Sequence, residues 1–121
     1  MEEEPVALEA IVALQQPMKD SRVHTISFQS SSISDLHAQV LAAGIINHPT
    51  LTTLNLSNNE LTDDGARFIS QLINANPNLL GVSLTENKIG DEGAKHLAES
   101  LKKHPKLQLL SLDGNRVCFF S

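Results

Sequence analysis

The chain contains 121 residues, with a formal net charge of −5 at pH 7 and a sequence pI near 5.4. This length fits one domain, and the acidic balance argues against a nucleic acid partner, because binding to phosphates needs a basic surface. The single cysteine, Cys118, excludes an internal disulfide and favours a reducing compartment.

Residues 1–22 are predicted to form an N-terminal capping helix, within residues 4–16, and a linker. Apolar side chains recur there at helical spacing on one face: Ala7, Ile11, Leu14 and Met18. Three glutamates at positions 2–4 give the start of the chain the wrong charge for a signal peptide, and no apolar run reaches the length of a membrane span. We therefore expect a cytoplasmic protein that does not bind membranes.

Residues 23–121 are predicted to form four repeats of 28 residues, the last of which lacks its helix. Three copies begin at Leu51, Leu79 and Leu107 and follow the pattern L-x-x-L-x-L-x-x-N-x-L, with exchanges among aliphatic residues. An atypical first copy begins at Val23 and has Ser31 in place of the asparagine. A fixed period of this length is typical of a solenoid, and this spacing is the leucine-rich repeat pattern.

Each repeat is expected to contain one strand and one helix. Residues 54–57 alternate in polarity like a half-buried strand, and Ala66, Ile69 and Ile73 then follow at helical spacing, as do Ala94, Leu97 and Leu101 in the next copy. Prolines one period apart, at positions 49, 77 and 105, end the helices. The predicted fold class is an α/β leucine-rich repeat solenoid, a short horseshoe with parallel strands on the concave face and helices on the convex face.

The helix starts, Asp63-Asp64-Gly65-Ala66 and Asp91-Glu92-Gly93-Ala94, resemble those of the ribonuclease-inhibitor-like subclass of leucine-rich repeat proteins. The resemblance covers residues 23–117 and departs at Phe28 and His37. It implies a protein-binding horseshoe that inhibits or regulates a partner enzyme. Short proteins of this subclass are also similar to effectors that intracellular bacterial pathogens deliver, so the host cytoplasm is an alternative location.

Polar side chains at fixed repeat positions are predicted to be structural. Asn59, Asn87 and Asn115 would satisfy backbone groups of adjacent turns as an asparagine ladder, with Ser31 as a weaker first step. Thr62 would cap its helix, followed by carboxylates that suit the positive end of the helix dipole. His48 and His104 share one slot before proline and belong to the repeat design.

The alternation also predicts which side chains line the concave face. They form three rows: Thr25, Thr53, Gly81, Leu109; Ser27, Asn55, Ser83, Ser111; and Gln29, Ser57, Thr85, Asp113. The loops that leave the strands add charges at the C-terminal rim, where Lys88 and Arg116 could pair with Glu60 or Asp113. The predicted partner-binding residues are Thr25, Ser27, Gln29, Thr53, Asn55, Ser57, Ser83, Thr85, Glu86, Lys88, Leu109, Ser111, Asp113 and Arg116.

Other interpretations stay open for these surfaces. The concave face could be a solvated sheet of small residues, and the rim charges could be ordinary surface charges. Phe68 and Leu72 favour packing between helices over a docking patch on the convex face. Phe119 and Phe120 could fold back as a cap, mark a truncated chain, or form an apolar edge for binding or dimerisation.

No catalytic constellation is apparent in the sequence. The five histidines lack the spacing of a metal pair, the acidic residues at the helix starts fit capping better than calcium binding, and Cys118 has no base beside it in sequence. We predict a protein that is not an enzyme, needs no cofactor or metal, and binds one protein partner, itself an enzyme, while remaining monomeric otherwise. The alternative is a fragment of a larger leucine-rich repeat scaffold or receptor.

Overall fold

The computed structural model describes residues 22–117 of the chain. The predicted capping helix, Cys118 and the two C-terminal phenylalanines lie outside the described residues. The domain boundary between residues 22 and 23 therefore stays a prediction.

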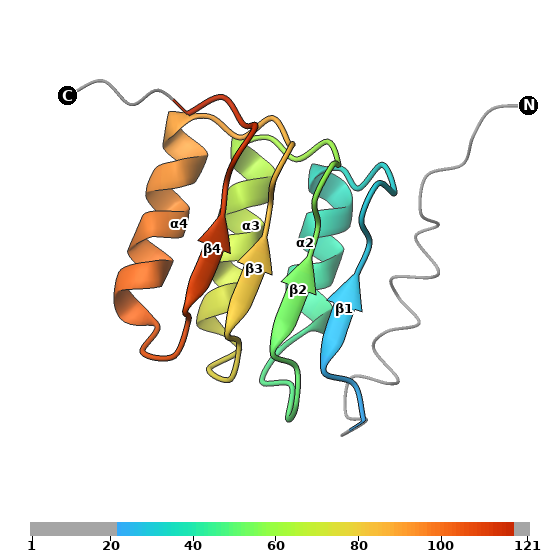
Figure 1. Ribbon diagram of the computed structural model, residues 1–121, viewed down its shortest axis with the longest axis vertical. Coiled ribbons are helices and arrows are strands. Elements are labelled where there is room, and N and C mark those ends of the chain that lie inside the picture. The colour runs from blue at the N-terminus through green and yellow to red at the C-terminus, as the bar shows by residue number, and fades with distance from the viewer. Residues whose placement is uncertain (1–21, 118–121) are drawn as a thin grey trace, which may run out of the picture.

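The described residues form two layers, a four-stranded sheet and a row of helices on one of its faces (Figure 1). The elements in chain order are β1 (Thr25–Ser27), α2 (Asp35–Gly44), β2 (Thr53–Asn55), α3 (Asp63–Asn74), β3 (Gly81–Ser83), α4 (Asp91–Lys103) and β4 (Leu109–Ser111). The sheet order β1-β2-β3-β4 follows the chain, and every pair of strands is parallel. The predicted fold class is therefore confirmed.

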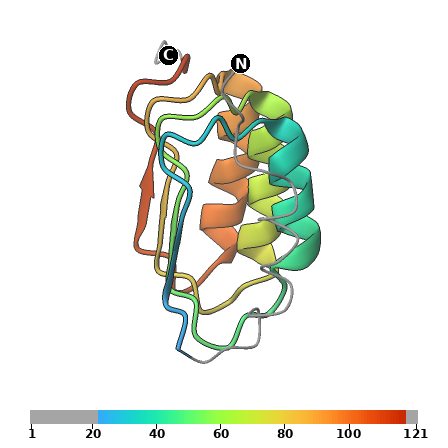
Figure 2. The same ribbon diagram turned by 90° about the vertical axis from the view of Figure 1, so that its right-hand side faces the viewer.

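The register of the sheet keeps the 28-residue period. Thr25 pairs with Thr53, Thr53 with Gly81, and Gly81 with Leu109. Figure 2 shows the sheet edge-on, with the helices packed on one side and the opposite face open. We call this open face the concave face, and residues at equivalent repeat positions lie side by side along it.

The core lies between the two layers. Leu54 and Leu56 point into it from the second repeat, and Ala66, Ile69 and Ile73 of α3 meet them; all five side chains have no solvent exposure. Leu72 is equally buried, and Phe68 packs against the core, which confirms the predicted packing between helices.

A column of asparagines closes the turns after the strands, as predicted; we call it the strand-exit column (Asn59, Asn87 and Asn115). The Asn59 Oδ1 atom accepts hydrogen bonds from the Ser31 and Ile33 amides of the preceding repeat, at 2.9 and 2.8 Å. Its Nδ2 donates to the Phe28 and Leu56 carbonyls, both at 2.9 Å. Asn87 and Asn115 repeat the arrangement, so each amide joins two adjacent turns. The shorter Ser31 reaches only the Gln29 carbonyl, two residues earlier in its own turn.

A second buried column lies at the opposite end of the strands, where each helix leads into the next strand; we call it the turn column (His48, Asn76 and His104). The Nδ1 atoms of the two histidines accept the amides two and three residues later, so each imidazole closes its own turn. Asn76 instead accepts the His48 amide at 2.9 Å and donates to the Ile45 carbonyl at 2.8 Å. The histidines belong to the repeat design, as predicted, but Asn76 completes the column.

The helix starts are capped by the preceding repeat, which corrects the prediction for Thr62. Thr62 occupies the N-cap position of α3, but its hydroxyl makes no cap bond and donates to the Asp35 carboxylate at 2.5 Å. The Asp35 carboxylate also accepts the Thr62 amide, and Asp63 accepts the amides of Gly90 and Gly93. Asp35 at the start of α2 and Asp63 at the start of α3 therefore each accept backbone amides at the start of the next helix.

This exchange explains the departure at His37. A Cβ on Gly93 would lie 2.8 Å from the Asp63 Oδ1 atom, and one on Gly65 would collide with Asp35, so this slot must be glycine wherever an aspartate reaches it. His37 occupies the same slot in the first repeat, where its own Nδ1 accepts the Ser34 amide at 3.0 Å. The imidazole thus does for α2 what the aspartates do for α3 and α4.

Candidate functional site: the concave face and its rim

The strands place the first two predicted rows on the concave face. Residue 27 pairs with residue 55, 55 with 83, and 83 with 111, next to the row that begins at Thr25. The third row lies just past the strand ends, where backbone bonds such as Asn58 N to Thr85 O, 2.7 Å, keep adjacent turns together. The structure therefore assembles all three rows, while their role in binding stays a prediction.

Side chains in the middle of the concave face bond to one another. The Asn55 Nδ2 atom donates to the Gln29 Oε1 atom at 3.1 Å, and its Oδ1 accepts the Ser57 amide at 3.0 Å. The Ser57 and Ser83 hydroxyls are 2.6 Å apart and share one hydrogen bond across β2 and β3. These contacts fix the side chains in place, so the middle of the face is a preorganised polar surface.

The first row changes in character towards β4. Thr25 and Thr53 are exposed hydroxyl-bearing residues, but Gly81 and Leu109 follow them. Leu109 has 61% of its surface exposed, because glycine offers no side chain to cover it. At β4 the concave face therefore ends in the exposed apolar side chain of Leu109, and no side chain fills the empty place above Gly81 beside it.

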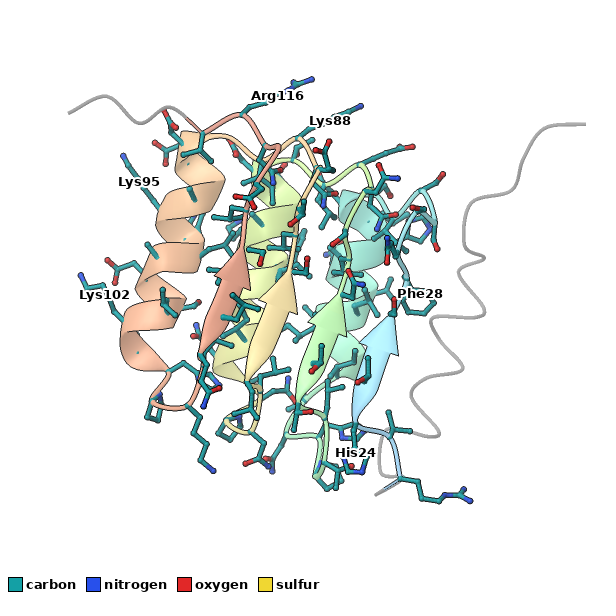
Figure 3. The ribbon with its side chains drawn as sticks, in the orientation of Figure 1. His24, Phe28, Lys88, Lys95, Lys102 and Arg116 are labelled. Atoms are coloured by element: carbon teal, nitrogen blue, oxygen red, sulfur yellow. The ribbon has the colours of Figure 1, made fainter. Side chains whose placement is uncertain are left out.

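The charges of the rim lie in the turns beyond the strands. The Lys88 amide donates to the Leu61 carbonyl at 2.8 Å, and the Arg116 amide donates to the Ile89 carbonyl at 2.7 Å, so the two cationic residues are neighbours in adjacent repeats. Figure 3 shows both side chains projecting from the same end of the molecule.

Lys88 and Arg116 do not pair with Glu60 or Asp113. Within residues 22–117 the ion pairs of lysine and arginine with carboxylates are Lys95 with Glu92 and Lys102 with Glu99, each three residues apart on α4. Glu60 occupies the position equivalent to Lys88 one repeat earlier, but no ion pair joins the two side chains. The rim therefore offers two cationic groups that pair with no carboxylate among the described residues.

A left-handed backbone turn recurs at the rim and was not foreseen. Ser30, Asn58 and Glu86 have φ values of 57°, 59° and 59°, and Gly114 has 76° at the equivalent position. Asparagine and glycine tolerate this conformation well, but serine and glutamate give no such signal in a sequence. The Glu86 side chain lies over Gly114, in the space a Cβ there would need.

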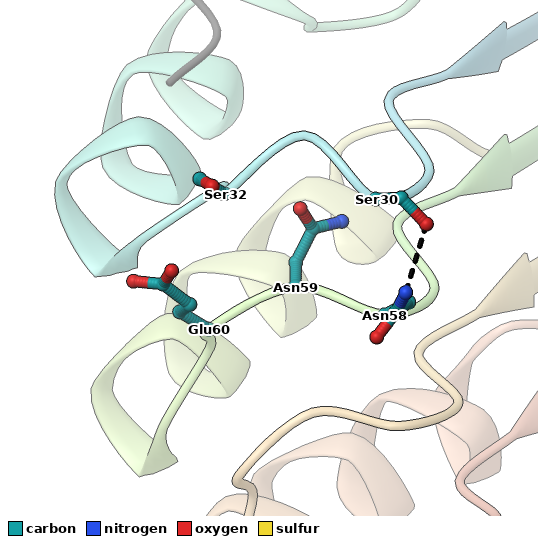
Figure 4. Close-up of a pocket in the computed structure, with 5 residues that line it drawn as sticks. All are labelled: Ser30, Ser32, Asn58, Asn59 and Glu60. Carbon is teal, nitrogen blue, oxygen red and sulfur yellow. Dashed lines mark hydrogen bonds between the residues drawn. The ribbon is translucent and has the colours of Figure 1, made fainter. Parts of the chain in front are cut away.

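A polar hollow of about 320 Å³ opens between the first two of these turns (Figure 4). It is lined by Ser30, Ser32, Asn58, Asn59 and Glu60. The Asn58 Nδ2 atom donates to the Ser30 hydroxyl at 2.9 Å, and the Asn59 amide is engaged in the strand-exit column. The hollow offers hydroxyl and carboxylate groups to a polar group of a partner, and it extends the predicted surface towards the N-terminal repeats.

The histidines that make hydrogen bonds in the structure have structural roles. His37, His48 and His104 are buried and accept backbone amides, and His24 lies 3.2 Å from the Thr50 carbonyl. Residues 22–117 hold no group of three histidine, cysteine or acidic side chains placed to bind a metal ion. In the same part of the chain, none of the helices combines the length and apolar character of a membrane span.

Comparisons with known proteins agree with the repeat assignment. A family model described as leucine-rich repeat matches residues 47–70 and 75–98, two segments that start one period of 28 residues apart. No curated protein sequence matches the chain significantly.

Two solved structures share the arrangement of strands and helices. The tropomodulin C-terminal domain of Caenorhabditis elegans has a TM-score of 0.76 and 17% identity over 87% of this chain. A leiomodin-1 structure described as actin-binding site 2 has a TM-score of 0.83 and 16% identity over 97% of this chain. The matches span 65% and 68% of those two chains, respectively. Identities this low show the fold alone, and that fold is an array of leucine-rich repeats.

Proposed function

We propose that the chain is a binding module that holds a protein partner on its concave face and C-terminal rim. The observation that carries the proposal is the contrast along this surface. Small, fixed polar side chains cover its middle, and Lys88 and Arg116, which pair with no carboxylate of residues 22–117, stand at one end. An ordinary solvated sheet needs neither the fixed polar contacts nor the unneutralised charges.

The surface favours a partner that brings its own bulky anchors. Interface hot spots are enriched in tryptophan, tyrosine and arginine, and the three rows contain none of these residues. The empty place above Gly81, beside the exposed Leu109, suits an apolar side chain of the partner, while Lys88 and Arg116 suit carboxylates nearby. An interface of standard size buries about 800 Å² on each side, which a four-stranded face with its rim can supply.

Actin is the first partner to test, because the leiomodin-1 structure of the same fold is described as an actin-binding site. The second candidate is regulation or inhibition of a partner enzyme in the cytoplasm. The lack of bulky side chains favours this second candidate, because a flat surface can accept a protruding loop around an active site. A fragment of a larger repeat scaffold would use the same face, and the structural relatives are longer than this chain.

The experiment compares three forms of the protein in binding to purified actin monomers and filaments, and in capture from cell lysates followed by mass spectrometry. The concave variant carries Thr53→Arg, Thr85→Arg and Ser111→Arg, one change on each of three adjacent repeats. The control carries Gln39→Arg, Ala43→Arg and Gln71→Arg, which add the same charge on exposed positions of α2 and α3.

Binding by the wild type and the control, but not by the concave variant, is the expected result. A further variant, Lys88→Glu with Arg116→Glu, should weaken the same interaction and reduce its dependence on salt. Equal binding by the concave variant and the control would show that the concave face is not the binding surface. Capture of an enzyme whose activity falls on binding would establish inhibition.

A further inference from the structure

The edge of the sheet opposite the rim has a charge pattern of its own. We call it the turn edge; it comprises the turns that lead into β2, β3 and β4 (residues 45–52, 75–80 and 104–108). These turns contain no aspartate or glutamate. Among the described acidic residues, all but Glu99 lie in the strand-exit turns or in the first turn of a helix. In Figure 3 the turn edge is at the bottom of the molecule, where His24 is labelled, and Lys88 and Arg116 lie at the top.

Two lysines give the turn edge a positive charge. Lys103 is the last residue of α4, and Lys106 follows in the turn before β4. The Lys106 Nζ atom donates to the Asn78 Oδ1 atom of the preceding repeat at 3.4 Å. Neither lysine forms an ion pair with a carboxylate of residues 22–117, whereas Lys102 pairs with Glu99 at 3.7 Å on α4. Lys103 and Lys106 therefore present two positive charges to the surroundings of this edge.

A hollow of about 320 Å³ lies beside these lysines, between the turn after α3 and the turn after α4. It is lined by Asn74, Pro77, Lys103, His104 and Pro105. The two prolines are exposed and occupy equivalent positions of successive repeats, so their rings form an apolar wall. His104 is buried, and its ring nitrogens contact the Leu107 amide and the Asn76 carbonyl, so the wall that it forms is held in place.

We propose that the turn edge binds an acidic segment of another protein, with one apolar side chain of that segment in the hollow and its carboxylates on Lys103 and Lys106. Pockets for small molecules measure about 300–1,000 Å³, so a hollow at the lower limit suits a single side chain better than a whole cofactor. Because the turn edge carries no carboxylate, an acidic segment meets no repulsion from side chains there. The site lies on the opposite edge from the rim and does not rest on the proposed function.

Helix capping explains only part of this arrangement. A lysine in the last turn of a helix is favourable beside the negative end of the helix dipole, which accounts for Lys103 without a partner. Lys106 lies beyond α4, and its ammonium group reaches back to Asn78, the residue after Pro77. The dipole gives no reason for a second positive charge at that place. Complementarity to an acidic segment accounts for both lysines together.

The test is a titration of the isotope-labelled 121-residue chain with synthetic pentapeptides, followed by NMR of its backbone amides. The probe is Glu-Glu-Phe-Glu-Glu, acetylated and amidated so that its charge comes from the glutamates alone. In two matched peptides, alanine replaces the phenylalanine or lysines replace the glutamates. We expect the probe to shift the signals of residues 74–80 and 103–108. The alanine peptide should bind about fivefold more weakly, and the lysine peptide should cause no shift.

Matched variants test the lysines and the hollow separately. Lys103→Gln with Lys106→Gln should weaken binding of the probe about tenfold, because it removes both charges. Lys95→Gln with Lys102→Gln removes the same charge from lysines that already pair with glutamates, and binding should stay within about twofold. Asn74→Phe, at an exposed position, fills the hollow and should lower the affinity for the probe to that of the alanine peptide. The amide spectrum of each free variant checks that it is folded.

Three results would overturn the proposal. The first is the absence of any shift up to about 5 mM probe. The second is binding that the Lys103→Gln and Lys106→Gln changes do not weaken. The third is a set of shifts centred on Lys88 and Arg116, which would place the acidic peptide on the rim. The concave variant changes no residue of the turn edge, so a failure of the proposed function and a failure of this site are separate results.

Discussion

The strand-exit column and the turn column solve the same problem in different ways. Both are buried except at Asn115, which is partly exposed, both recur every 28 residues, and both satisfy backbone groups where the chain reverses direction. The strand-exit column uses asparagine at all three of its positions. Each side-chain amide must accept hydrogen bonds from backbone amides of the preceding repeat and donate to carbonyls of that repeat and of its own. The turn column uses histidine, asparagine and histidine.

The difference shows what fixes a residue in a repeat protein. Closing a turn within one repeat can be done by an imidazole nitrogen, as in His48 and His104, or by a backbone carbonyl, as where the Leu79 amide bonds to Asn76 O. The asparagine side chains bridge two repeats through several bonds of one amide, whereas His104 reaches the preceding repeat through a single contact of its Nε2 with the Asn76 carbonyl. We therefore expect residues that bridge repeats to be the most sensitive to substitution.

Asn87→Ala should have the largest effect, a loss of about 3 kcal/mol in the free energy of unfolding measured in urea. The change leaves the buried Leu61 amide without its partner and removes one of the two asparagine bonds to each of the Leu56 and Leu84 carbonyls. A buried unsatisfied group costs about 1–3 kcal/mol before relaxation. A loss below about 1 kcal/mol would show that water replaces the amide and that the strand-exit column is dispensable.

Asn76→Ala should cost about 2 kcal/mol, because the Asn76 side chain both accepts from and donates to the preceding repeat. Asn78→Ala is the matched control two residues later, since its Nδ2 makes one long bond of 3.4 Å to the Pro49 carbonyl at an exposed position. Thermal unfolding of the two variants should give clearly separated midpoints. Equal midpoints would contradict the importance of the bridge.

His104→Ala should cost about 1–2 kcal/mol, less than a bridging residue, because its ring mainly closes its own turn through the Lys106 and Leu107 amides. His104→Asn should recover only part of this loss, since the shorter amide cannot keep both these bonds and the 2.9 Å contact from Nε2 to the Asn76 carbonyl. Full recovery in a urea titration would mean that the two residue types are interchangeable in this slot.

Asp63→Ala should have the smallest effect on stability, about 1 kcal/mol. Asp63 caps the start of α4 and belongs to neither the strand-exit column nor the turn column. Asp64→Ala is its control, an exposed neighbour on the same helix. Helix content by circular dichroism should stay the same, while the unfolding midpoint falls only for Asp63→Ala. If both variants behave alike, the charge at the start of α3 matters more than the bond to α4.

The sequence predicts those features of the fold for which the same residue type recurs at the same position of each repeat. The spacing from Leu51 to Leu79 to Leu107 fixed the register of the sheet, and the asparagines at the same spacing identified the strand-exit column. These positions are readable because one residue type satisfies the same geometry each time.

Features whose backbone geometry recurs in each repeat, but with different residue types, could not be predicted from the sequence. The left-handed turn contains serine, asparagine, glutamate and glycine, and the turn column mixes histidine with asparagine. The cap from Asp63 to α4 also escaped, because an acidic residue at a helix start is usually assigned to its own helix. For the candidate site, the rows on the concave face follow from the register, whereas the ion pairs of the rim depend on side-chain directions that a repeat pattern does not specify.

The bonds between repeats run in two directions, and this has a consequence for how the protein emerges from the ribosome. The aspartate caps point forward, so the cap for α4 already exists in α3 when α4 is made. The asparagine bridges point backward, so the turn around Ile33 stays incomplete until Asn59 has been added. At synthesis rates of about 5–20 residues per second, each repeat waits about one to six seconds for the next one to complete it. A nascent chain of this protein therefore always carries one unfinished turn, at the end nearest the ribosome, where chaperones can bind it.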